Sequence, residues 1–180
     1  WPATAFVAWY NGHPDFQGCD FDLSCRRAVV VGNGNVAVDV ARMLALADEE
    51  LAPTDTTDAA IEAILASPIE EIVVLGRRGP AQASFTTPEL QELGELADTD
   101  IAVDPAELEL EPASEAALSD TTVARNLEVM RGYAGRAPAG KRRTLRLRFR
   151  VSPVAILGSD RVEGIEVVRN TLVADGDGRV

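Results

Sequence analysis

An apolar strand, a glycine turn and a helix follow one another without a break between Val29 and Leu44. The stretch reads VVVGNGNVAVDVARML, and the apolar run before the turn is typical of a central parallel strand. The turn fits the pattern G-x-G-x-x-G/A, with Gly32, Gly34 and Ala37 at the three small positions. Between a strand and a helix, this pattern predicts a turn that holds the pyrophosphate of a dinucleotide. The alternative is a tight strand–helix turn without a ligand.

Each small residue of the turn has a physical reason. Gly32 permits the sharp turn out of the strand, and Gly34 lets a pyrophosphate approach the backbone because it has no side chain. Ala37 is small enough for the helix to pack close to the strand. We expect Asn35 to cap the helix, whose free N–H groups and positive dipole end would face the phosphates.

Two adjacent arginines, Arg77 and Arg78, follow the next apolar strand, EIVVLG. An NAD-binding unit carries a carboxylate near this point, which holds the ribose hydroxyls. Guanidinium groups would instead bind a 2′-phosphate, so the sequence favours NADP(H). An extra helical segment, 48–67, separates this strand from the glycine turn, so the assignment depends on topology and not on spacing. The alternative is a pair of solvated arginines at a strand end.

The remaining pattern predicts an α/β domain of the Rossmann-like, three-layer type, with a parallel sheet and an antiparallel β appendage. Strands are expected at 27–32 and 71–77, and helices at 36–47, about 57–66 and 121–133, with a short helix in TTPELQELGELA. Residues 4–10 are expected to form a strand or linker, and the acidic segment 98–113 to be irregular with one short strand. A period-two pattern in RTLRLRFRVSPVAILG and VEGIEVVRNTLV, with a turn at Ser159-Asp160, predicts the antiparallel section.

Composition excludes several functions. The formal net charge of -12 argues against nonspecific nucleic-acid binding, and no apolar run is long enough to span a membrane. Cys19 and Cys25 have no zinc-binding spacing, so we expect free thiols and a reducing cytoplasm. With His13 as the single histidine, we predict no metal site. The chain starts at Trp1 and ends in the turn DGDGRV, and we expect it to be a domain of a longer protein.

Two carboxylates lie three residues apart in FTTPELQEL and share one helix face. Glu89 fits the N3 position of a capping box with Thr86, which is as plausible as a ligand contact from the residues alone. For Glu92, a solvated helix position is the default interpretation.

Several segments together resemble the adrenodoxin-reductase type of ferredoxin–NADP reductase, and its bacterial members in particular. They are FVAWYNGHPDF, VVVGNGNVAVDVARML, APTDTTDAAIEAIL, VLGRRGPAQASFTTPELQEL and RFRVSPVAILG with VEGIEVVRN. The resemblance covers nearly the whole chain. It implies a two-domain flavoenzyme in which an NADP-binding domain, here residues 1–180, is inserted into a FAD domain that this chain lacks.

The resemblance also implies roles for single residues. The pyrophosphate turn matches at Asn33, Gly34, Asn35 and Val36, and the 2′-phosphate pair matches at Arg77 and Arg78. Glu89 matches a glutamate that contacts NADP. Glu92 matches an acidic residue near the meeting point of flavin and nicotinamide, and is the predicted catalytic residue, although its histidine partner would lie upstream of Trp1.

The implied chemistry is hydride transfer from NADPH to FAD, followed by single-electron transfer to ferredoxin or a similar small iron–sulfur protein. Ferredoxins are acidic, so such a partner would dock on local basic residues. The candidates in this sequence are Arg125, Arg131, Lys141, Arg142 and Arg143. We expect instead that Arg146, Arg148 and Arg150 line the outer face of a strand and that the others are solvated. The alternative functions are the NADP domain of another flavin oxidoreductase, of the glutamate-synthase small-subunit or disulfide-reductase type, and a nonenzymatic NADP-sensing module.

Overall fold

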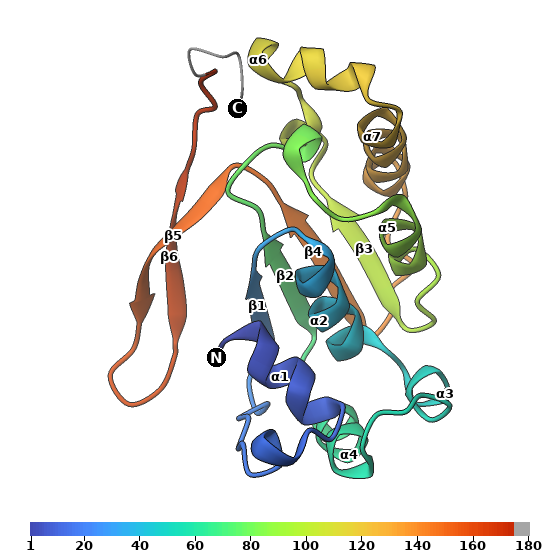
Figure 1. Cartoon of the computed structure of the whole chain (residues 1–180), viewed down its shortest axis with the longest axis vertical. Helices are drawn as coiled ribbons and strands as arrows, with labels where there is room; N and C mark the ends of the chain where they lie inside the picture. Colours follow the sequence, from blue (N-terminus) through green and yellow to red (C-terminus); the bar gives the residue numbers. More distant parts are fainter. Residues whose placement is uncertain (175–180) are drawn as a thin grey trace.

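The computed structural model describes residues 1–174 and is built around a four-stranded parallel sheet (Figure 1). The strand order is β1-β2-β4-β3, with bounds β1 Arg27–Val31, β2 Glu71–Leu75, β3 Thr99–Val103 and β4 Arg143–Arg148. Val31 pairs with Leu75, and Leu75 pairs with Arg148. Because all four strands are parallel, the segments that follow β1, β2 and β4 meet at one edge of the sheet. The expected turn at DGDGRV, residues 175–180, lies outside the described residues.

A layer of helices packs against this sheet. Helix α2 (Asn35–Ala45) contacts β1, β2 and β4, α7 (Thr121–Ala134) contacts β3, and α5 (Thr87–Leu93) joins α2 to α7. Helix α1 (Ala3–Tyr10) packs against α2 and α4 (Asp58–Ala66), as Figure 1 shows. Short helices complete the connections: η1 Pro14–Phe16, α3 Asp48–Leu51, η2 Pro80–Gln82, η3 Pro105–Leu108, α6 Pro112–Glu115 and η4 Ala116–Ser119. No helix within residues 1–174 is long and apolar enough to cross a lipid bilayer.

The appendage is a two-stranded antiparallel ribbon of β5 (Val151–Leu157) and β6 (Gly164–Arg169). Its connection contains the predicted Ser159-Asp160 turn. In Figure 1 the ribbon projects away from the helix layer. The predicted α/β class, parallel sheet and antiparallel appendage are thus confirmed.

The prediction for residues 4–10 was wrong, because this segment is helix α1. Phe6 and Tyr10, spaced four apart, are buried together, and the Phe6 ring also contacts Trp9 and Phe21. An apolar run as short as TAFVAWY does not distinguish a buried strand from a buried helix. The aromatic cluster forms only in the folded chain, and its contacts stabilise the helix.

The assignment of the first half of the period-two region to the antiparallel section was also wrong. Strand β4 is parallel to both β2 and β3. Its alternation arises because Leu145 and Leu147 are buried, whereas Arg146 and Arg148 are half-buried and form ion pairs with Glu71 and Glu107. One buried and one polar face give the same period-two pattern in either strand direction.

Two expectations for the basic residues were wrong: Arg143 is not solvated, and Arg150 does not line the outer face of a strand. Arg143 is 1% exposed, and its guanidinium donates to the carbonyls of Leu46, Ile69 and Ile64. It thereby satisfies carbonyl groups near the C-terminal ends of α2 and α4. Arg150 follows β4, is 6% exposed and has a positive φ of 57°. Arg143 is therefore excluded as a docking residue.

Candidate nucleotide-binding site

The glycine turn joins β1 to α2 as the sequence predicts. The N–H of Gly32 donates to the carbonyl of Leu75 at 2.8 Å, which continues the pairing of β1 with β2 into the turn. Gly32 has a φ of 132°, in the region that favours glycine. A Cβ on Gly32 would lie 3.5 Å from the Cβ of Ala37, in ordinary contact, so the helix starts directly against the strand end.

No side chain in the described part of the chain caps the N-terminus of α2. Gly34 is the N-cap residue and has no side-chain oxygen, so the first N–H groups of the helix are available to a ligand. The prediction that Asn35 caps the helix was wrong, because Asn35 is the first residue inside it. Its Oδ1 instead accepts the backbone N–H of Thr86 at 2.9 Å. Val36, in the same first turn, is 52% exposed.

Asn33 carries a buried donor that has no acceptor within the described residues: its Nδ2. This atom lies against Gly76, since a Cβ there would come within 2.6 Å of it. A buried amide hydrogen without an acceptor is costly, so a ligand oxygen at this point would satisfy it. The turn, with its open helix end and this donor, fits the pyrophosphate that the motif predicts.

Arg77 and Arg78 follow β2 after Gly76, at the same edge of the sheet as the glycine turn. Both residues are exposed, and neither guanidinium has an ion-pair partner among residues 1–174. Residues 1–174 contain eight ion pairs, all between other residues, so carboxylates are not scarce. The topology brings the two sequence features, glycine turn and arginine pair, to adjacent strand ends.

A third segment, Ser84–Thr86, lies beside the turn, and sequence reasoning missed it. Ser84 forms a parallel bridge with Gly34, and its N–H donates to the carbonyl of Asn33 at 3.2 Å. The segment follows η2 and leads into α5, so its position depends on the long connection after β2. The only sequence signal was that its last residue, Thr86, is the N-cap member of the predicted capping box.

Glu89 forms that capping box. It is the N3 residue of α5 and accepts the N–H of Thr86 at 3.1 Å as well as the Thr86 hydroxyl. Because Thr86 also bonds Asn35, the capping box is linked to the first turn of α2. Its additional role as a nucleotide contact stays a prediction.

Glu92 lies one turn further along α5 and faces α2. One carboxylate oxygen lies 3.5 Å from Nε of Arg42, and both side chains are partly exposed. This pair ties the two helices together. The predicted catalytic role of Glu92 is a separate matter and stays a prediction.

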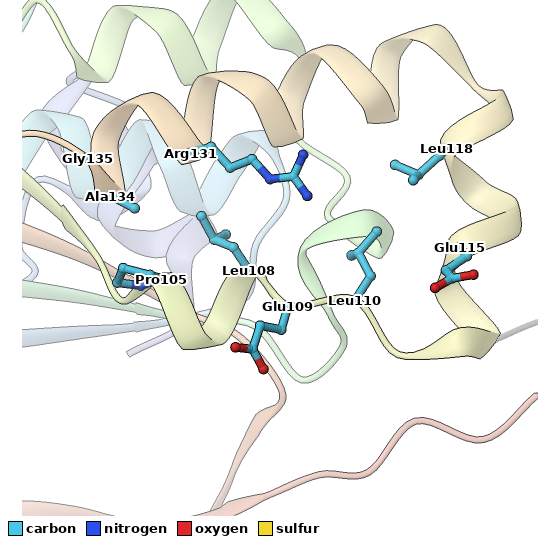
Figure 2. Close-up of a pocket in the computed structure, with 9 residues that line it drawn as sticks. All are labelled: Pro105, Leu108, Glu109, Leu110, Glu115, Leu118, Arg131, Ala134 and Gly135. Carbon is cyan, nitrogen blue, oxygen red and sulfur yellow. The ribbon is translucent and has the colours of Figure 1, made fainter.

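An open pocket of about 860 Å³ lies away from the glycine turn, between η3, the α6–η4 segment and the end of α7 (Figure 2). Arg131, one of the basic residues considered for docking, lines it together with Leu108, Leu110 and Leu118. Among the other basic residues, Arg125 pairs with Glu128, and Lys141 donates to the carbonyl of Leu96. Arg142 donates to the carbonyl of Ser67. The pocket shares no residue with the glycine turn.

Fold and site together define a Rossmann-like α/β domain with a dinucleotide-type turn and a basic pair at the next strand end. No family model matches the chain. The NADPH-ferredoxin reductase FprA of Mycobacterium tuberculosis is 49% identical over 178 residues, which are 99% of this chain and 39% of that protein. The mitochondrial NADPH:adrenodoxin oxidoreductase of Mus musculus is 48% identical over 105 residues, 58% of this chain and 21% of that protein.

The solved structure of Mycobacterium tuberculosis FprA in complex with NADPH matches this fold with a TM-score of 0.91 at 48% identity. It covers 98% of this chain and 39% of that chain. The chain is thus a homologue of the adrenodoxin-reductase type of ferredoxin–NADP reductase, and the resemblance noted in the sequence is confirmed. The chain spans 39% of the length of FprA.

Proposed function

We propose that this chain binds NADP(H) and acts as the NADP-binding domain of a flavin-dependent ferredoxin–NADP reductase. The observation that carries the proposal is that Arg77 and Arg78, which have no ion-pair partner among residues 1–174, lie beside a glycine turn with an open helix N-terminus. A 2′-phosphate between the guanidinium groups would form charge-assisted bonds that NAD(H) cannot form. The pyrophosphate would lie on Gly32, Asn33, Gly34, Asn35 and Val36, with Glu89 as a further contact.

In this proposal the chain orients the nicotinamide by fixing the nucleotide at two points, the 2′-phosphate and the pyrophosphate. The arginines hold the 2′-phosphate, and the first turn of α2 holds the pyrophosphate. Bound FAD, held mainly by a second domain of the same polypeptide, would accept the hydride and pass on single electrons. The electron acceptor would be ferredoxin or a similar small iron–sulfur protein, as the names of the relatives suggest. The same names do not favour a glutamate-synthase or disulfide-reductase type of enzyme.

Glu92 is the proposed catalytic residue, carried over from the resemblance alone. Glu92→Gln should then leave the Kd for NADP+ unchanged and alter the rate and pH profile of flavin reduction in the full-length protein. Arg42→Ala is the matched control, because it breaks the Arg42–Glu92 pair and keeps the carboxylate. If the two variants change flavin reduction equally, Glu92 acts only through that pair.

We also propose that the protein works in the cytoplasm. Cys19 and Cys25 are both free, as predicted, and neither is buried. Accessible thiols persist in a reducing compartment.

Titration of the purified protein with NADP+ and NAD+ tests the proposed function. The protein should bind NADP+ at least about a hundredfold more tightly, since two charge-assisted pairs contribute about 1.5–3 kcal/mol each. Arg77→Ala combined with Arg78→Ala should abolish this preference and leave NAD+ affinity unchanged. An unchanged preference would reject the phosphate site. A full-length preparation that is colourless and cannot be reconstituted with FAD would reject the reductase.

A further inference from the structure

The backbone of the three residues Gly76–Arg78, which follow β2, forms hydrogen bonds with residues at and after the end of β4. The N–H of Gly76 donates to the carbonyl of Arg148 at 2.8 Å, and the N–H of Val151 donates to the carbonyl of Gly76 at 3.0 Å. The N–H of Arg150 donates to the carbonyl of Arg78 at 2.9 Å. The backbone of the arginine pair is therefore fixed, although both side chains are exposed.

The remaining carbonyl, that of Arg77, accepts a side-chain bond. Nδ2 of Asn170 donates to it at 2.7 Å, across 93 residues of sequence. Asn170 follows the last strand of the ribbon. Its Nδ2 also contacts Oγ of Ser152 at 2.8 Å, and its N–H donates to the carbonyl of Arg150 at 2.7 Å. Three bonds thus fix Asn170 at the base of the ribbon, with one of its amide hydrogens directed at Arg77.

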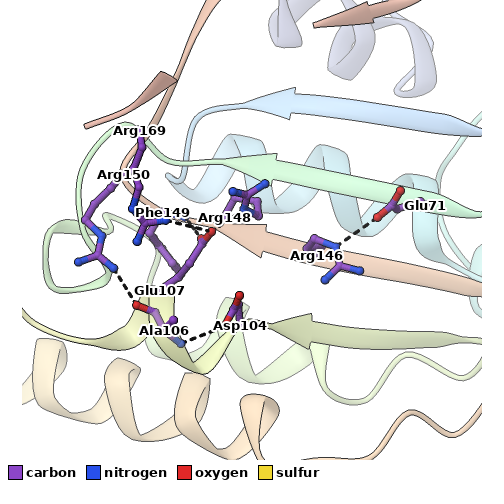
Figure 3. Close-up of polar contacts among 9 residues, drawn as sticks. All are labelled: Glu71, Asp104, Ala106, Glu107, Arg146, Arg148, Phe149, Arg150 and Arg169. Carbon is purple, nitrogen blue, oxygen red and sulfur yellow. Dashed lines mark hydrogen bonds and ion pairs between the residues drawn. The ribbon is translucent and has the colours of Figure 1, made fainter. Parts of the chain in front are cut away.

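Arg150, which contacts both segments, has a backbone conformation that few residues other than glycine adopt. Its φ is 57°. Its guanidinium donates to the carbonyl of Glu109 at 3.1 Å and to that of Ala106 at 3.0 Å, and Figure 3 shows the bond to Ala106. A non-glycine residue in this region is strained and persists only where its surroundings hold it. Here the strained residue bonds Arg78 through its N–H and Asn170 through its carbonyl. Arg150, at the junction of sheet and ribbon, therefore links the backbone of Arg78 to that of Asn170.

We propose that Asn170 is a positioning residue for nucleotide selectivity. By fixing the carbonyl of Arg77, it holds the guanidinium pair at a set place relative to the glycine turn, without contact to the nucleotide. An exposed arginine loses side-chain freedom when it binds phosphate, and a fixed backbone limits that loss to the side chain. The inference rests on the proposed function, because it assumes that Arg77 and Arg78 bind the 2′-phosphate.

Asn170→Ala tests the inference by equilibrium titration of the purified protein with NADP+ and NAD+. Removal of one positioning hydrogen bond should weaken NADP+ binding about three- to tenfold and leave NAD+ binding unchanged. Thr171→Ala, at the exposed neighbouring residue, is the matched control and should change neither. If Asn170→Ala does not fold, Asn170→Leu keeps the volume and removes the amide.

A double-mutant comparison separates this inference from the proposed function. In the Arg77→Ala, Arg78→Ala background, Asn170→Ala should no longer change the ratio of the two affinities, because its effect passes through the arginines. Equal weakening of NADP+ and NAD+ by Asn170→Ala would show a merely structural role and overturn the inference. No change in the ratio after Asn170→Ala alone would also overturn it. If the arginine double variant itself keeps the NADP+ preference, the proposed function fails first.

Discussion

The side chain of Asn126 on α7 donates its Nδ2 hydrogen to the carbonyl of Phe85, at 3.1 Å and across 41 residues of sequence. Its Oδ1 accepts the hydroxyl of Thr87 at 2.6 Å. Asn126 is 4% exposed, so one buried amide bridges both sides of Thr86. Thr86 in turn bonds Asn35 in the first turn of α2. A helix remote from the glycine turn in sequence therefore fixes the segment beside it.

Asn126→Asp should destabilise the protein by about 1–3 kcal/mol, because the buried carbonyl of Phe85 loses its donor. It should also weaken NADP+ binding, since the Ser84–Thr86 segment is then held less firmly beside the turn. Urea unfolding and nucleotide titration measure the two effects. Arg125→Ala, which breaks an exposed pair with Glu128 on the same helix, should cost about 0.5 kcal/mol or less. Equal stability of the two variants would contradict this account.

Gly76→Ala should disturb the nucleotide site directly. The new Cβ would come within 2.6 Å of Nδ2 and 3.1 Å of Cγ of Asn33, so the asparagine must move. We expect weaker NADP+ binding and a loss of about 1–3 kcal/mol from overpacking. The control is Gly132→Ala in α7, where a Cβ meets nothing within 4 Å and should add up to about 1 kcal/mol of stability. Unchanged NADP+ affinity in Gly76→Ala would exclude Asn33 from the site.

Arg143→Met tests the buried guanidinium. Burial lowers the pKa of this arginine. Its guanidinium donates to three carbonyl groups near two helix ends, where a positive charge is favourable. Methionine fills much of the volume and leaves those carbonyls without donors, so we expect a loss of about 3 kcal/mol or more in urea unfolding. Arg142→Ala, at the exposed neighbour, should cost about 1 kcal/mol. A methionine variant as stable as the parent would show that the carbonyls find other donors.

Asp100 makes stability depend on pH. Backbone N–H groups of Ala139, Lys141 and Gly140 donate to its carboxylate, and these bonds lower its pKa below the ordinary value of 3.8. The stabilisation is therefore complete above pH 3.8 and is lost as the pH falls through the lower native pKa.

Asp100→Asn should accordingly be less stable than the parent at neutral pH, and the difference should shrink in increasingly acidic buffer. Chemical unfolding across this pH series measures it. Glu62→Gln, at an exposed position of α4, is the control. A difference between parent and Asp100→Asn that stays constant with pH would contradict the assignment.

The sequence predicted the parts of the fold that depend on local pattern. The apolar runs before Gly32 and Gly76 identified β1 and β2, and the capping box of Thr86 and Glu89 identified the start of α5. The glycine turn and the arginine pair were found because each residue type has a specific chemical reason at its position. Their adjacency followed from the parallel topology alone.

Other features depend on contacts that no local pattern encodes. The alternation in β4 reports one covered face but not the direction of the neighbouring strand, and the run that forms α1 suits either structure. The bond from Asn170 to Arg77 joins segments 93 residues apart. The positive φ of Arg150 could not be predicted, because this conformation is typical of glycine and not of arginine. These long-range contacts hold the predicted binding residues in place.

A crystal structure of the protein with bound NADP+ would locate the 2′-phosphate. We expect it within ion-pair distance of the guanidinium groups of Arg77 and Arg78. We also expect the pyrophosphate on the N–H groups at the start of α2, with Nδ2 of Asn33 bonded to a ligand oxygen. A nucleotide bound elsewhere, or one whose 2′-phosphate contacts neither arginine, would contradict the proposed site.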